Sequence, residues 1–279
     1  MSEKGRLWRT FKKNKTALIG SIVAILIIIA ACLAPVISPY DPFEQDVANR
    51  LGPPSRLHFL GSDDFGRDVL SRVIWSIRIS LTVGLFSVII GLFIGTMMGV
   101  VAGYKGGIVE IVIMRTVDVL LCFPTLITGI MVAAILGTGQ VNLIITIGII
   151  FTPRFARLAY GPTLGIKEVE YLNAARVIGA SHLRMIGRHL LPNIFGDLLV
   201  AATLWMGAAI LMEASLSFLG LGVSPPNPTW GNMIKSGMDN LSNAPWLSLY
   251  PGLATLITVL SFNMIGDGLR DVIDPKLRI

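Results

Sequence analysis

Residues 17–37 read ALIGSIVAILIIIAACLAPVI, and none of these side chains is charged. A helix of about 20 apolar residues is long enough to cross the hydrocarbon core of a bilayer. The stretch therefore predicts a membrane-spanning helix that ends near Pro35 and Pro39, where the chain cannot continue a regular helix easily.

Five further apolar stretches follow. They cover about residues 79–102, 108–136, 141–158, 194–211 and 247–269. Of the 279 residues, 53% are hydrophobic and 14% are charged, whereas soluble domains carry about 25% charged residues. This composition excludes a soluble enzyme. Because the runs lack the alternation of barrel strands, we expect an all-α polytopic membrane protein with six transmembrane helices.

The basic residues predict the orientation of these helices. Sixteen Lys and Arg residues fall on the side that holds both termini, six fall on the other side, and Arg115 lies within a span. By the positive-inside rule both termini are cytoplasmic. The net charge of +6 comes mostly from residues that flank apolar spans, so we expect a lipid bilayer and no nucleic acid as partner.

The sequence shows no constellation for catalysis, for a cofactor or for a metal ion. It contains no G-x-x-x-x-G-K-[ST], no H-E-x-x-H and no C-x-x-C motif. We therefore expect a protein that is not an enzyme and has no cofactor in this chain. If it moves a solute uphill, the energy comes from an ion gradient or from another chain.

Charged residues within the spans would serve a gradient-driven carrier. Arg115 and Asp118 are three residues apart on one helix face, so we expect them to pair with each other. Glu213 and Asp267 fall towards span ends. An ion-gradient-driven secondary transporter that uses these charges is the alternative from a different functional class.

Glycines recur at every fourth position along the second span, at Gly91, Gly95, Gly99 and Gly103. Such a stripe lets two helices approach closely. It predicts either packing within the chain or an interface with another subunit, and the sequence leaves both open.

The polar stretch after the fourth span is patterned. Residues 168–192 read EVEYLNAARVIGASHLRMIGRHLLP, and small or apolar residues recur at steps of three and four. The pattern predicts one face of a helix or helix–turn–helix, made by Ala175, Ile178, Gly179, His182, Ile186 and His189. That face needs a protein partner, unless the helix rests on anionic lipid through its arginines.

This stretch resembles the EAA loop of ABC importer permeases, E-A-A-x3-G-x9-I-x-L-P. The residues in register are Ala174, Ala175, Gly179, Leu191 and Pro192. Asn173 stands where Glu is usual, and His189 stands where Ile is usual. Both departures resemble the dipeptide/oligopeptide branch of these permeases, and they weaken any role for a glutamate of this loop.

Other stretches are similar to the second permease subunit of that branch, the DppC/OppC type. They are LGSDDFGRDVLSR (60–72), the Arg115–Asp118–Pro124 pattern, SFLGLGVSPPNPTWG (217–231) and GDGLRDVIDPKLR (266–278). The resemblance implies a MetI-like permease fold, with an N-terminal helix before a five-helix core and a cytoplasmic coupling helix.

The implied domains are the cytoplasmic N-terminus with the first helix (1–38), an extracytoplasmic segment (39–78) and the core (79–279), with its coupling loop at about 163–193. The implied location is the inner or plasma membrane of a prokaryotic cell, which the chain crosses several times.

The resemblance also implies partners. They are a second homologous permease that forms a heterodimer, two ABC ATPases that bind ATP and Mg, and an extracytoplasmic solute-binding protein. The expected ATPase-coupling residues are Tyr171, Asn173, Ala174, Ala175, Arg176, Gly179, Ala180, Ser181, Arg184, His189 and Pro192. The expected binding-protein or gate region comprises Gly61, Asp63, Asp64, Gly66, Arg67, Asp68, Pro225 and Trp230.

The implied function is the passage of a substrate from the binding protein to the cytoplasm by alternating access. A di- or oligopeptide is the substrate that this branch suggests. Nickel or another metal chelate, glutathione and an oligosaccharide stay open, since no residue of this chain selects among them.

Overall fold

A computed structural model describes residues 14–273, and the regular structure in that part of the chain is helical. The elements are α2 (Lys15–Ile37), η1 (Val47–Asn49), α3 (Val69–Lys105), α4 (Gly107–Cys122), α5 (Thr125–Leu136), α6 (Gln140–Lys167), α7 (Glu170–Val177), α8 (His182–Arg184), η2 (Met185–Leu190), α9 (Leu191–Phe218), α10 (Trp230–Asp239) and α11 (Trp246–Ile273). Residues 1–13 and the last part of the 266–278 stretch lie outside the described range.

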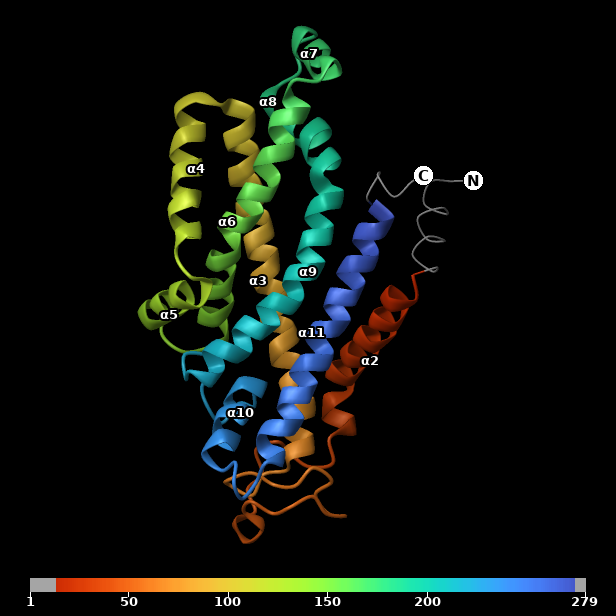
Figure 1. Cartoon of the computed structure of the whole chain (residues 1–279), viewed down its shortest axis with the longest axis vertical. Coiled ribbons are helices and arrows are strands. Elements are labelled where there is room, and N and C mark those ends of the chain that lie inside the picture. The colour runs from red at the N-terminus through yellow and green to blue at the C-terminus, as the bar shows by residue number, and fades with distance from the viewer. Residues whose placement is uncertain (1–13, 274–279) are drawn as a thin grey trace.

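The long helices run side by side along one axis (Figure 1). Five stretches are long and apolar enough to cross a membrane, and the bent pair of α4 and α5 makes a sixth when it counts as one span. The six predicted spans are therefore found. The start of α2 and the end of α11 lie together, since the Asn14 side-chain nitrogen donates to an Asp271 carboxylate oxygen at 2.8 Å.

The third predicted span, residues 108–136, is not one straight helix. It breaks between α4 and α5, whose axes differ by 100°. Phe123 has φ −82° and ψ 139°, an extended conformation, and Pro124 follows it. A residue before proline is pushed out of the helical region by the proline ring, which explains why the helix ends there.

The fourth span is longer than predicted, since α6 runs from Gln140 to Lys167 without a break at Pro153 or Pro162. Arg154 and Arg157 therefore lie within α6 and not in the loop after it.

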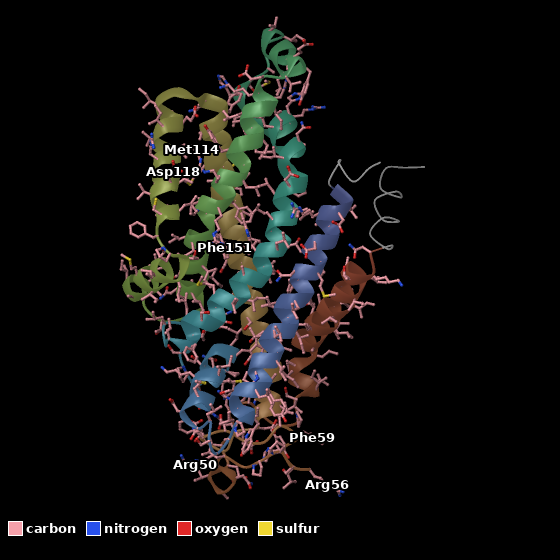
Figure 2. The ribbon with its side chains drawn as sticks, in the orientation of Figure 1. Arg50, Arg56, Phe59, Met114, Asp118 and Phe151 are labelled. Atoms are coloured by element: carbon pink, nitrogen blue, oxygen red, sulfur yellow. The ribbon has the colours of Figure 1, made fainter. Side chains whose placement is uncertain are left out.

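The glycine stripe of α3 packs against α6 within the same chain. A Cβ atom on Gly95 would lie 2.6 Å from the Phe155 Cβ, and one on Gly99 would collide with the Ala156 carbonyl. Phe151 and Phe155 fill the core beside this contact (Figure 2). Of the two readings left open by the sequence, packing within the chain accounts for the stripe.

Candidate functional site

Two regions at opposite ends of the bundle hold most of the predicted site residues. The tip segment, residues 168–190 with α7, α8 and η2, lies at one end (Figure 1). The loop end, made by residues 38–68 and 219–229 with α10, lies at the other.

The tip segment is fixed to the bundle by apolar side chains. Leu172, Met185 and Leu190 are at most 1% exposed and belong to the same buried cluster as Phe151 of α6 and Leu198 of α9. Burial of this kind stabilises each side chain by about 1.5–3 kcal/mol. The inner side of the segment is therefore part of the core.

Polar contacts reinforce this attachment. The Tyr104 hydroxyl, at the end of α3, lies 2.8 Å from Nδ1 of His182, and the two rings meet edge to face. The Asn193 side-chain nitrogen in α9 donates to the Tyr171 hydroxyl at 3.2 Å, and the Tyr171 ring lies beside His189. Two of the predicted coupling residues, Tyr171 and His189, therefore lie where the tip segment joins α9.

The outer side of the tip segment exposes three apolar side chains. Val177 is 88% exposed, Ile178 86% and Leu183 83%. Gly179 has a φ of +88°, and its neighbourhood is open, so the chain reverses there without a packing constraint. The Ala180 amide donates to the Ala175 carbonyl at 3.0 Å, and the Ser181 hydroxyl caps α8.

We call Val177, Ile178 and Leu183 the apolar tip. Three apolar side chains that project together from the end of a molecule mark a surface for another protein or for lipid. The sequence did not single out Val177 or Leu183.

Residues 168–192 form a helix–turn–helix, which is one of the two forms predicted from the pattern, but the six patterned residues do not all face the same way. Ala175 and Ile186 pack against the core and His182 contacts Tyr104, whereas Ile178 points away. The reason is that α7 ends at Val177 and the chain turns at Gly179, so residues before and after the turn do not share one helix. Arg184 and Pro192 are exposed. The side chains of Asn173, Ala174 and Arg176 lie outside the described part.

The loop end contains a buried network of charges. An Asp63 carboxylate oxygen accepts from Nε of Arg67 at 2.7 Å and lies 3.4 Å from Nε of Arg72. The other oxygen accepts from the backbone amides of Phe65 and Arg67. Asp64 lies 3.7 Å from a terminal nitrogen of Arg67. Asp63 thus contacts two guanidinium groups and fixes its own loop.

Asp68 and two glycines complete this loop. Asp68 caps α3 through the amide and hydroxyl of Ser71, and its other carboxylate oxygen lies 2.9 Å from Nδ1 of His58. Gly61 and Gly66 have φ of +80° and +78°, and a Cβ on Gly66 would overlap the Asp46 backbone. These residues build the shape of the loop.

The two predicted parts of the binding-protein region meet at one cavity of about 440 Å³. Asp63, Asp64, Arg67 and Pro225 all line it, together with Gln45, Asn227 and Asn232. Trp230 is 1% exposed, and its indole nitrogen donates to the Val73 carbonyl, so this residue supports the helices. The cavity joins segments about 160 residues apart in the sequence.

The predicted pair of Arg115 and Asp118 needs correction. Asp118 contacts the Arg157 guanidinium of α6, while Arg115 is exposed and has no carboxylate within ion-pair distance among the described residues. Glu213 is fully buried within α9 and accepts from the hydroxyls of Ser80 and Ser217 at 2.7 and 2.8 Å. The spacing of residues in the sequence predicts neither the contact of Asp118 with Arg157 nor the hydrogen bonds that Glu213 accepts.

Comparison with known families gives two matches. The family described as binding-protein-dependent transport system inner membrane component matches residues 91–279. The family described as N-terminal TM domain of oligopeptide transport permease C matches residues 5–54.

Relatives of known name match nearly the whole chain. A dipeptide transport system permease protein of Alkalihalophilus pseudofirmus is 41% identical over 97% of this chain and 89% of the relative. A glutathione transport system permease protein of Pectobacterium atrosepticum is 42% identical over 97% and 90%. A di/tripeptide transport system permease protein of Pseudomonas aeruginosa is 43% identical over 97% and 91%.

Among solved structures, an inward-facing conformation of the MetNI methionine ABC transporter contains a similar chain. The TM-score is 0.59 at 19% identity, and the match covers 74% of this chain and 97% of that one. The similarity concerns the fold, and it confirms the MetI-like arrangement expected from the sequence.

Proposed function

We propose a short peptide as the substrate of this chain, which belongs to the family of binding-protein-dependent transport system inner membrane components and is a permease subunit of an ABC importer. The chain itself is a multi-pass membrane protein and not an enzyme. The substrate, the individual partners and the orientation in the membrane are the proposed parts.

The apolar tip is the single observation that carries the proposed coupling. Its three side chains project from a segment whose other side is buried in the core and bonded to α3 and α9. A partner that covers Val177, Ile178 and Leu183 would therefore pull on two membrane helices at once. We propose that this partner is one of two ABC ATPases, which bind ATP and Mg and supply the energy.

The proposed orientation follows from this assignment. The tip segment and both termini are cytoplasmic, and the loop end faces outside, in the inner or plasma membrane. The extracytoplasmic solute-binding protein docks at the loop end, beside the cavity lined by Asp63, Arg67 and Pro225. The second permease of the complex is a homologue that pairs with this chain as a heterodimer.

A dipeptide or tripeptide is the proposed substrate because two of the relatives carry these names. Glutathione is a second candidate, since an equally similar relative is a glutathione permease. Both are short peptides with free carboxylates. The passage follows alternating access, with the loop end open first and the tip end open second.

The test is to purify the tagged chain from its own host in a mild detergent and to identify its partners by mass spectrometry. We expect a second permease and ABC ATPases. The co-purified binding protein is then titrated calorimetrically with a dipeptide and with glutathione, and the tighter ligand decides the substrate. A stable homo-oligomer without an ATPase, under conditions that preserve other membrane complexes, would contradict the proposal.

A further inference from the structure

Arg154 lies on the side of α6 that faces away from α3. The opposite side of α6 carries Gly148, Thr152, Phe155 and Ala159, which lie against α3 near its glycines. Because successive helical residues are rotated by about 100°, Arg154 is turned well away from the middle of that side. Arg154 therefore points towards α4 and α5, where its guanidinium meets Thr125.

The guanidinium of Arg154 has no acidic partner among the described residues. One terminal nitrogen donates to the Thr125 hydroxyl of α5 at 2.7 Å, and the group lies 5.5 Å from the centre of the Phe151 ring. The neighbouring Arg157 is paired with Asp118, which Figure 2 labels on α4. Arg154 thus leaves a net positive charge on this side of the bundle.

This charge lies in a helix that is long and apolar enough to cross a membrane. Arg154 is fourteen residues into the 28 residues of α6, which at 1.5 Å per residue places it about 21 Å from Gln140. The hydrocarbon core is about 30 Å thick. A charged side chain at this depth is costly against lipid, so such residues face a protein partner or a water-filled path.

The backbone beside Arg154, at the break between α4 and α5, favours the water-filled path. The break between α4 and α5 leaves non-helical backbone at Phe123 and Pro124. Inside a membrane such backbone is tolerated where it is buried in protein or lines a wet cavity. A cavity of about 60 Å³ lies at this break, and Arg154 lines it with Phe123, Thr125 and Thr128.

We propose that Arg154 binds the carboxylate of the substrate as it passes α5. This inference rests on the proposed function. A dipeptide and glutathione both carry a C-terminal carboxylate, which is ionised at pH 7 because the pKa of an α-carboxyl is about 3.5. A guanidinium binds a carboxylate with two parallel hydrogen bonds. Thr125 holds one nitrogen in place and leaves other N–H groups free for the substrate.

The test replaces the charge and then restores it chemically. Arg154→Cys is made in a background with Cys32→Ser and Cys122→Ser, and the complete transporter is reconstituted in proteoliposomes with its binding protein. We expect dipeptide uptake to fall about tenfold, the loss expected for a charge-assisted hydrogen bond. Modification with the cationic 2-aminoethyl methanethiosulfonate restores most of the uptake, and the anionic 2-sulfonatoethyl reagent does not.

The matched control is Phe93→Cys in the same background, since Phe93 is an exposed apolar residue on α3. We expect neither reagent to alter uptake at this position. If the thiol introduced by Arg154→Cys does not react, the inference is overturned, because the position would be dry. Uptake that is unchanged by Arg154→Cys would also overturn it. Loss of the second permease on purification would overturn it too, because Arg154 would then bind an acid of that subunit.

The two proposals fail differently. If the unmodified transporter accumulates neither dipeptide nor glutathione, the proposed substrate is wrong. If the transporter accumulates one of them and the charge at position 154 makes no difference, the substrate proposal survives and the role of Arg154 is wrong.

Discussion

The loop end and the tip segment differ in whether their side chains find partners within the chain. At the loop end, Asp63 lies within ion-pair distance of two buried arginines and accepts from two backbone amides within its own chain. At the tip, Val177, Ile178 and Leu183 have no covering surface among the described residues. A region whose charges are already paired gains little from a partner, whereas exposed apolar side chains gain their burial only from one. The two ends should therefore respond differently to mutation.

Two glycines with nearly equal backbone angles give the sharpest contrast. Gly66 and Gly179 have φ of +78° and +88°, yet a Cβ on Gly66 would overlap Asp46 and one on Gly179 would meet nothing. We expect Gly66→Ala to cost more than about 4 kcal/mol of unfolding free energy and to abolish the folded yield. Gly179→Ala costs about 1 kcal/mol of backbone strain. The folded yield of Gly66→Ala and the thermal unfolding of purified Gly179→Ala check this, and a Gly66→Ala variant that folds as well as Gly179→Ala would contradict the comparison.

Removing the central carboxylate of the loop end should be the next largest effect. Asp63→Ala leaves Arg67 and Arg72 buried without their carboxylate, which costs about 3 kcal/mol. Asp64→Ala is the matched control, because its contact with Arg67 is longer and more exposed and is worth at most about 1 kcal/mol. Chemical denaturation in detergent measures both. A control as damaging as Asp63→Ala would show that the loop end is not organised around Asp63.

At the tip we expect a change in binding without a change in folding. Ile178→Ser alters the unfolding free energy by less than about 0.5 kcal/mol, because the side chain is already exposed. The same change weakens ATPase association about tenfold, since it removes the apolar burial that the partner supplies. Unfolding and ATPase titration are measured together.

Leu172→Ser is the control for the tip, because Leu172 lies in the same segment but is buried. It should destabilise the chain by about 2 kcal/mol or more. Unaltered ATPase affinity of Ile178→Ser would remove the apolar tip from the coupling surface.

The smallest effect concerns the attachment of the tip. Tyr104→Phe removes the contact with His182, worth about 1 kcal/mol. The apolar tip is unchanged, so ATPase affinity should stay within about twofold. Local opening of the segment should increase about fivefold. Hydrogen–deuterium exchange of residues 168–190 measures this, and unchanged exchange would mean that the buried leucines alone hold the segment.

The sequence predicted what depends on length and composition. Six apolar stretches appear as spans, since a helix must satisfy its backbone within the membrane. The break at Pro124 could have been anticipated from the proline, but not its angle of 100°. The site residues were harder. Asp118 pairs with Arg157 of α6 instead of its neighbour Arg115, and such a contact depends on the packing of two helices, which residue spacing does not encode.

The glycine seam between α3 and α6 also determines what can move. The α6 carbonyl groups of Thr152 and Ala156 pack against the glycines of α3. Sliding α3 along α6 by one residue, about 1.5 Å, would bring α3 side chains against these carbonyl groups. The two helices are therefore expected to move together as one rigid unit. In this unit α3 alone is 37 residues or about 55 Å long. Movement that lets a solute through is then expected between this rigid pair and the helices outside the seam, and the bent helix α5 is one of them.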